Sequence, residues 1–254
     1  MPADPFRLDG RVALVTGATG GLGAAMAAAL ARAGADLVLH DRQVPPEDVA
    51  RAIAAETQQR TACLVADLLD RAATDRLIAD AISEMGQLDI LVNNAGTIRR
   101  APAAEFTDED WDAVLETNLT SAFRLCRAAG RHMLERGRGK IINVASLLSF
   151  QGGIMVPAYA AAKGGLAQVT KSLANEWAGR GINVNAIAPG YMRTDNTRPL
   201  VEDPLRYRQI VERIPAGRWG EPADLGGTAV FLASPASDYV HGHVLVVDGG
   251  WMGR

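Results

Sequence analysis

The sequence predicts one α/β domain over residues 1–254, built on an open, doubly wound parallel sheet of seven strands. Two observations lead to this prediction. Short apolar runs rich in β-branched residues alternate with longer stretches of helical periodicity along the whole chain. The short runs are apolar nearly throughout, as expected of strands that helices cover on both faces of a sheet. The chain shows no linker and no repeat beyond this alternation of strand and helix.

The elements are predicted in the following order. Strands are expected over residues 11–16, 35–40, 61–66, 88–93, 140–145, 182–188 and 243–247. Helices are expected over residues 21–33, 46–58, 71–85, 107–136 and 156–178, followed by polar helices between 202 and 233. Thr107, with Asp110 three residues later, is typical of a helix start. The last strand is expected at a sheet edge, where pairing with a second chain would cover it.

The composition argues against several classes of protein. The formal net charge of −3 gives no basic surface for nucleic acid, and no apolar run approaches the roughly 18 residues of a membrane helix. Residues 1–10 carry acids and two prolines, which is unlike a signal peptide. Cys63 and Cys126 lie in apolar stretches, so we expect buried, reduced thiols in a cytosolic protein. No Cys/His cluster accompanies them, so no metal site is expected.

A glycine-rich loop, TGATGGLG, follows the first strand and opens the first helix. Glycines here let the backbone turn sharply and approach a pyrophosphate, toward which the next helix presents free N–H groups. The alternative is an ordinary turn between strand and helix, but the position after the first strand favours a dinucleotide site in a Rossmann fold. The candidate contacts are Gly17, Thr19, Gly21, Leu22 and Gly23.

Polar residues end the next strands. Asp41 stands 18 residues after Gly23, where a carboxylate accepts hydrogen bonds from ribose hydroxyls and repels a 2′-phosphate. This predicts NAD(H) over NADP(H), although Arg42 offers a phosphate partner and Asp41 has the alternative of a strand-end turn residue. Further cofactor candidates at strand ends are Asp67, Leu68, Asn94, Ala95 and Gly96.

A tyrosine and a lysine share one face of the helix at 156–178. Tyr159 and Lys163 are four residues apart, in a chain that has four tyrosines and three lysines. A tyrosine of pKa about 10 is a poor acid or base at neutral pH, and a neighbouring ammonium group lowers that pKa. Ser146, at the end of the fifth strand, is placed to hold a substrate oxygen. The alternatives are a hydrogen-bonded core tyrosine, a solvated lysine and a capping serine.

Asn118 falls inside the predicted helix 107–136. Asparagine is unfavourable in a helix interior, so its presence predicts a local role.

Together these motifs resemble those of the short-chain dehydrogenase/reductase family, and the resemblance covers essentially the whole chain. It is carried by the loop from Thr16 to Gly23, Asn93-Asn94-Ala95-Gly96, Asn118, Ser146, Tyr159-x-x-x-Lys163 and Pro189-Gly190.

The resemblance implies a role for each matching residue. Tyr159 would be the general acid/base, Ser146 would position the carbonyl, and Lys163 would tune Tyr159 and hold the nicotinamide ribose. Asn118 would hold a water in a proton relay. The family also implies a homotetramer. The residues implied at the nicotinamide end are Pro189, Gly190, Met192 and Thr194.

Residues 190–222 are predicted to form a lid over the site. This segment carries six arginines and five acids but few large apolar residues, which indicates a polar substrate. Arginine is the preferred partner of a carboxylate, although a solvated face of ion pairs is the alternative. Arg100 also lies near the predicted cleft. The substrate candidates are Arg99, Ser146, Gln151, Tyr159 and Arg193.

Several loops, including residues 93–100 and 149–153, resemble a narrower group of the family that acts on keto-deoxy sugar acids. The predicted function is therefore an NAD(H)-dependent oxidoreductase with a keto sugar acid as its small-molecule substrate. The alternatives are a 3-oxoacyl-carrier-protein reductase, a neutral sugar or polyol dehydrogenase, and a non-catalytic nucleotide-sensing module. Residues 251–254 are expected to reach a neighbouring subunit, with a mobile tail as the alternative.

Overall fold

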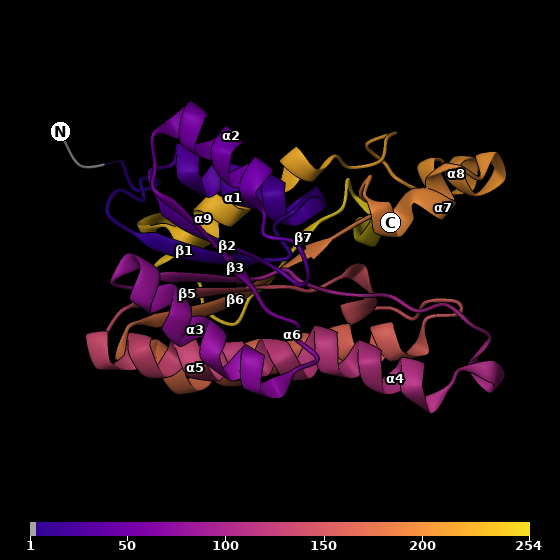
Figure 1. Ribbon diagram of the computed structural model, residues 1–254. Coiled ribbons are helices and arrows are strands. Elements are labelled where there is room, and N and C mark those ends of the chain that lie inside the picture. The colour runs from indigo at the N-terminus through magenta and orange to yellow at the C-terminus, as the bar shows by residue number, and fades with distance from the viewer. Residues whose placement is uncertain (1–3) are drawn as a thin grey trace.

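A computed structural model describes residues 4–254, with a seven-stranded parallel sheet between two layers of helices (Figure 1). The strand order is β3-β2-β1-β4-β5-β6-β7, so the predicted doubly wound parallel sheet is confirmed. Each strand boundary lies within two residues of the expected one. The strands are β1 (Val12–Thr16), β2 (Asp36–Asp41), β3 (Thr61–Val65), β4 (Ile90–Asn93), β5 (Gly139–Val144), β6 (Ile182–Pro189) and β7 (Val244–Val247).

Each face of the sheet has its own apolar core. On one face lie α1 (Gly21–Arg32), α2 (Glu47–Thr57) and α9 (Gly226–Ala233), and on the other lie α3 (Arg71–Met85), α5 (Ser121–Arg136) and α6 (Pro157–Trp177) (Figure 1). The alternation of apolar strands with amphipathic helices thus folds as two buried layers around the sheet.

Helix α9 corrects one expectation. The segment up to residue 233 is predicted to be polar, but the α9 sequence GGTAVFLA is apolar and packs against α1. A Cβ atom on Gly226 would lie 2.9 Å from the Cβ of Ala29, so glycine permits this close approach of the two helices.

The predicted helix at 107–136 is interrupted. It consists of α4 (Asp108–Leu115), a π-helical turn (Glu116–Thr120) and α5. The expected start is confirmed, because the Thr107 hydroxyl accepts a hydrogen bond from the backbone N–H of Asp110 at 3.1 Å. The expectation of one uninterrupted α-helix is wrong, because the backbone widens by a residue at the turn that contains Asn118.

The topology brings the candidate residues to one edge of the sheet. The chain leaves β1 for β2 on one side and returns to β4 on the other, and ligands bind such sheets at the carboxyl ends beside this switch point. β1, β4, β5 and β6 all end at this edge. The short helices α7 (Arg198–Val201) and α8 (Pro204–Val211) extend beyond the sheet at the end where α4 lies (Figure 1).

The two cysteines of the chain differ in burial. Both cysteines are free, with Cys126 buried as expected and Cys63 half-buried. Burial raises the pKa of the Cys126 thiol to about 12, which keeps it protonated and unreactive at neutral pH.

None of the helices in residues 4–254 has the length and apolar character that crossing a membrane requires.

Candidate active site

The glycine loop is shaped by backbone contacts that exclude side chains. Gly17 has a φ of +67°, which favours glycine. A Cβ on Gly23 would lie 2.1 Å from the carbonyl oxygen of Gly17, so the first turn of α1 packs directly on the loop. The amino end of α1 therefore opens toward the loop with free N–H groups, as a pyrophosphate site requires.

Asn94 ties this loop to β4. Its side-chain amide donates to the carbonyl oxygens of Thr16 (2.9 Å) and Gly17 (3.0 Å). The Thr16 hydroxyl in turn accepts from the backbone N–H groups of Asn94 and Ala95, both at 3.0 Å. The predicted cofactor residue Asn94 thus holds the shape of the loop through its side chain, and Ala95 and Gly96 follow directly beside the loop.

Asp41 lies at the carboxyl end of β2, against the loop. Its carboxylate accepts hydrogen bonds from the Thr19 hydroxyl (2.6 Å), the Thr19 backbone N–H (3.1 Å) and the Arg42 backbone N–H (2.7 Å). The two predicted residues Asp41 and Thr19 are therefore in direct contact. With Arg42 they line a pocket of about 500 Å³ that extends along residues 43–49.

The two cofactor residues predicted after β3 differ in exposure. Asp67 is exposed and its carboxylate accepts the backbone N–H of Leu69 at 3.0 Å. Leu68 is 4% exposed and packs in the core under α3, so its side chain does not face the cleft. A buried leucine at this position serves packing, and only the backbone of Leu68 remains available to a ligand.

Asn118 is buried in the π-helical turn and every polar atom of its side chain is used. The amide nitrogen donates to the carbonyl oxygens of Thr97 and Val114, both at 2.8 Å, and the amide oxygen accepts the backbone N–H of Thr97 at 3.2 Å. A Cβ on Gly96 would lie 2.6 Å from that oxygen. The predicted local role of Asn118 thus has a physical form, because it joins the turn to the segment after β4.

Tyr159 and Lys163 lie on α6 beside the end of β5, where Ser146 stands. The Lys163 side chain is 3% exposed, and its ammonium group donates to the carbonyl oxygen of Val144 at 2.6 Å. Burial lowers the pKa of Lys163 to about 8. The Ser149 hydroxyl donates to the Lys163 carbonyl oxygen at 2.7 Å and so fixes this helix against the Ser146 segment.

The environment of the Tyr159 phenol differs from the expected one. Burial has the largest effect and raises the pKa of Tyr159, while the Ser146 hydroxyl, as a hydrogen-bond partner, and the positive charge of Arg100 lower it. The expected lowering by Lys163 is not found, because that ammonium group is turned to Val144 and lies 5.6 Å from the centre of the tyrosine ring. The exposed Arg100 makes the smallest of these contributions to the pKa of Tyr159.

The two arginines predicted to meet a substrate are engaged elsewhere. The Arg99 guanidinium pairs with Asp110 at 3.2 Å, on the surface. Arg193 pairs with Glu221 at 3.1 Å and donates to the Tyr207 hydroxyl at 3.0 Å. Two more arginines of the predicted lid, Arg198 and Arg208, pair with acids of the same segment, and Arg218 pairs with Asp224, just beyond it. The alternative of a solvated face with ion pairs therefore describes most of this lid.

The remaining candidates lie around the start of the lid. The Gln151 amide oxygen accepts from the Trp251 indole at 3.4 Å. Gly190 packs against Asp248, where a Cβ would lie 2.7 Å from the Asp248 Cα. Met192 is buried, and a Cβ on Gly21 would lie 3.7 Å from a methyl carbon of Thr194, so the lid begins directly above the glycine loop.

An aromatic cluster that sequence reasoning missed closes the lid. Trp219 stacks on Tyr207 at 5.9 Å between ring centres, and Tyr191 lies 5.4 Å from Trp219 and 4.7 Å from Trp251. Trp251 is 5% exposed within its own chain. This cluster holds Trp251 against its own chain, whereas residues 252–254 are exposed, and the contact of residues 251–254 with a neighbouring subunit stays a prediction.

Comparisons with known proteins identify the family and several relatives of this chain. A family described as enoyl-(acyl carrier protein) reductase matches residues 17–252. The 2-dehydro-3-deoxy-D-gluconate 5-dehydrogenase of Bacillus subtilis is 53% identical over 99% of this chain and 98% of that protein. A putative 2-deoxy-D-gluconate 3-dehydrogenase from Agrobacterium tumefaciens, solved with bound NADP, is 53% identical with a TM-score of 0.92, covering 99% of this chain and 100% of that one.

A third relative is solved with a small acid. It is a gluconate 5-dehydrogenase from Burkholderia cenocepacia in complex with NADP and tartrate. It is 42% identical with a TM-score of 0.93, and the match covers 99% of this chain and 98% of that one.

Proposed function

The chain belongs to the short-chain dehydrogenase/reductase family, and on this premise we propose that it oxidises or reduces a deoxy sugar acid with a nicotinamide cofactor. The observation that carries the proposal is that Ser146, Tyr159 and Lys163 lie together at the carboxyl end of β5, while Arg100, in the segment after β4, bonds the lid. The first three suit a reacting carbonyl, and the fourth suits a carboxylate on the same small molecule.

The residues present fit a dinucleotide. The φ of Gly17 and the clash of any Cβ at Gly23 leave a cradle of bare backbone at the amino end of α1. Gly17, Thr19, Gly21, Leu22 and Gly23 would hold the pyrophosphate, and Thr194 would lie above it. When bound, the nicotinamide ring supplies or accepts the hydride. Pro189, Gly190 and Met192 would pack at that end of the cofactor.

Proton transfer would be the work of Tyr159. Its hydroxyl would donate to the substrate oxygen during reduction, and Ser146 would orient that oxygen by a second hydrogen bond. Lys163, with its ammonium group buried beside the ring, would hold the nicotinamide ribose. Asn118 would position, through its backbone, a water that restores the proton to Tyr159, because its side-chain atoms are bonded to Thr97 and Val114. The Arg100 charge favours the phenolate, so it supports the same acid/base role.

Arg100 is also our candidate for the substrate carboxylate. Its guanidinium donates to the carbonyl oxygen of Asn196 in the lid at 3.1 Å, which spans the cleft between the segment after β4 and the lid. That single neutral acceptor leaves most of its donors free, whereas Arg99 and Arg193 are held in ion pairs. The tartrate complex of the Burkholderia relative shows that such a fold accommodates a small dicarboxylate in that protein.

A substrate panel tests the proposed function. We expect keto-deoxy sugar acids to be reduced with a kcat/KM at least about tenfold above that of the matching neutral sugars, since a charge-assisted contact contributes about 1.5–3 kcal/mol. Initial rates of NADH and NADPH oxidation measure this. Faster turnover of an acetoacetyl thioester would instead support an acyl-carrier-protein reductase, and faster turnover of neutral sugars a polyol dehydrogenase.

We further propose that NAD(H) is preferred over NADP(H). A 2′-phosphate would come close to the Asp41 carboxylate, which Thr19 holds in place. The Agrobacterium and Burkholderia relatives hold NADP, and Arg42 lies next to Asp41, so this preference needs a direct measurement.

The ratio of kcat/KM for NADH to that for NADPH is expected to exceed about ten in the wild-type protein, because one unit of charge repulsion at short range contributes more than 1 kcal/mol. Asp41→Asn should lower this ratio by about tenfold. Asp67→Asn, at the end of the neighbouring strand, is the matched control and should leave the ratio unchanged. A wild-type advantage for NADPH would contradict the role assigned to Asp41.

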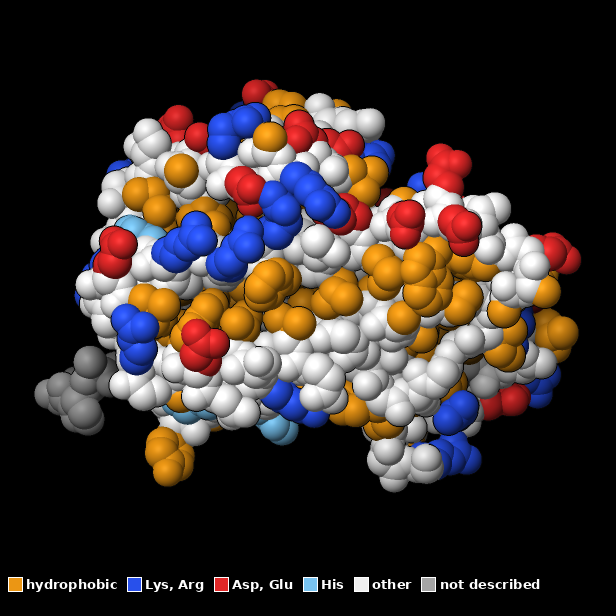
Figure 2. Space-filling model, turned by 90° about the horizontal axis from the view of Figure 1, so that it is seen from below, with side chains coloured by type: hydrophobic (Ala, Val, Ile, Leu, Met, Phe, Trp, Pro, Cys, Tyr) orange, Lys and Arg blue, Asp and Glu red, His pale blue; other side chains and the backbone are white. Residues whose placement is uncertain are grey.

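A homotetramer is proposed from two uncovered surfaces. The edge strand β7 is partly exposed along Leu245–Val247, and edge strands are normally covered. Apolar side chains also gather on the face of the helix layer with α4 and α5 (Figure 2), where Trp111 and Phe123 are exposed. Light scattering is expected to give four times the 26.9 kDa of one chain, and a monomer would contradict the proposal.

A further inference from the structure

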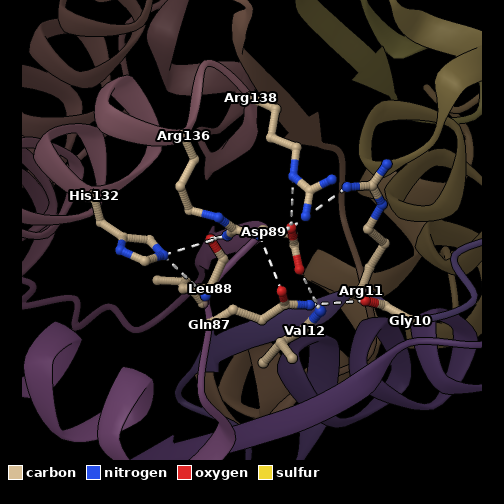
Figure 3. A network of polar contacts seen from close by, with 9 residues as sticks. All are labelled: Gly10, Arg11, Val12, Gln87, Leu88, Asp89, His132, Arg136 and Arg138. Atoms are coloured by element: carbon tan, nitrogen blue, oxygen red, sulfur yellow. Dashed lines mark hydrogen bonds and ion pairs between the residues drawn. The ribbon is translucent and has the colours of Figure 1, made fainter.

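Three arginines converge on one buried carboxylate at the amino ends of the strands, opposite the candidate active site (Figure 3). Asp89 precedes β4 and its side chain is 4% exposed. One of its oxygens accepts the backbone N–H of Val12 at 3.0 Å. The other faces Arg136 at 3.1 Å, Arg11 at 3.4 Å and Arg138 at 3.6 Å.

These contacts leave two of the three guanidinium groups poorly satisfied. Arg136 has further acceptors in the Leu88 carbonyl oxygen and the Gln87 amide oxygen, both at 3.0 Å. Arg11 and Arg138, whose side chains are 38% and 51% exposed, have only the long contacts to Asp89 among the side chains of residues 4–254, and charge-assisted bonds are normally about 2.7–2.9 Å. Three cations facing one anion leave an excess of two positive charges.

Arg11 and Arg138 both line a cavity of about 330 Å³, where their guanidinium groups are accessible to a ligand. Lys140 lines the same cavity and pairs with Asp238 at 2.7 Å, on the rim. Burial has the largest effect and lowers the pKa of Lys140, Asp238 raises it, and the charge of Arg11 has a smaller lowering effect. His241 also lines the cavity, and its buried Nδ1 atom has no hydrogen-bond partner within the described chain.

We propose that this cavity binds a small multivalent oxyanion such as phosphate, held by Arg11 and Arg138. Guanidinium groups present paired N–H donors that match phosphate geometry, and the volume lies at the small end of ligand pockets. Arg11 precedes β1 and Arg138 precedes β5, so a bound anion would connect strands on both sides of β4. Its effect falls on stability, which makes the site independent of the proposed reaction.

Thermal unfolding of the NADH-saturated protein tests the site, because bound cofactor occupies the pyrophosphate cradle. In inorganic phosphate, the unfolding temperature of the wild type is expected to rise by about 3 °C over chloride at equal ionic strength, following a one-site saturation curve. Arg138→Gln and Arg11→Gln should each raise the half-saturating phosphate concentration at least about tenfold, since each removes a charged hydrogen-bond donor. Arg131→Gln, at an exposed arginine of α5 outside the cavity, is the control and should keep the wild-type response.

Two outcomes would overturn the proposal. One is an equal unfolding temperature in phosphate and chloride, and the other is an undiminished phosphate response in Arg138→Gln. In chloride alone, Arg138→Gln is expected to be at least as stable as the wild type, because it relieves crowding among like charges. A purely structural Arg138–Asp89 ion pair predicts the reverse, a lower unfolding temperature in chloride.

Discussion

Replacing Tyr159 with phenylalanine lowers kcat for ketone reduction by at least about 100-fold, if the phenol is the general acid. The ring remains to fill its place against the apolar cluster between α4 and α6, so NADH binding is expected to be unchanged. Single-turnover rates and NADH fluorescence titration measure the two effects separately. The loss should appear in kcat rather than in KM, because the missing proton donor acts mainly in the transition state.

Tyr239→Phe is the matched control for this substitution. The Tyr239 side chain is fully exposed, so removal of its hydroxyl should leave kcat at the wild-type value. Undiminished turnover in Tyr159→Phe would exclude Tyr159 as the acid and with it the proposed mechanism.

The second large effect is expected at Arg100. Arg100→Gln should raise KM for a keto sugar acid by about 10- to 100-fold, because a charged hydrogen bond contributes about 1.5–3 kcal/mol. The KM for neutral sugars should change little. Arg100 also lowers the pKa of Tyr159, so removing its charge should raise that pKa and move the basic limb of the kcat/KM profile to higher pH.

The neighbouring Arg99 gives the control. Its guanidinium pairs with Asp110 on the surface, and such exposed pairs contribute little to stability. Arg99→Gln should therefore keep both the KM and the pH profile of the wild type. Arg100 would not be the partner of the substrate carboxylate if both variants raised KM equally, or if KM rose as much for neutral sugars as for acids.

Much of the fold follows from local sequence signals. Strands buried on both faces are apolar throughout, so their positions are visible without knowledge of tertiary contacts. The interruption of the helix at Asn118 is not visible in this way. It depends on a separate segment of the chain, because the backbone N–H and carbonyl oxygen of Thr97 bond the Asn118 side chain. The asparagine in a helix interior is the one local signal of this turn, and it predicts a role without predicting the widened backbone.

Part of the site is likewise predictable from local sequence, and part depends on contacts between distant segments. The spacing of Tyr159 and Lys163 along a helix predicts that they are neighbours, and they are. Arg99 pairs with Asp110, eleven residues further along the chain, whereas the adjacent Arg100 bonds the Asn196 carbonyl oxygen in the lid, and the spacing of the sequence does not predict this division. The inward packing of Trp251 likewise depends on Tyr191 and Gln151, far away in sequence.

The aromatic cluster of the lid has a practical consequence. Two of the four tryptophans in the chain, Trp219 and Trp251, lie in this cluster, against Tyr191 and Tyr207. Indole emission responds to the polarity and the ring contacts around it, so displacement of the lid would change the intrinsic fluorescence of the protein. The cluster that holds the lid thus serves as a built-in optical reporter of its position, readable without any attached dye.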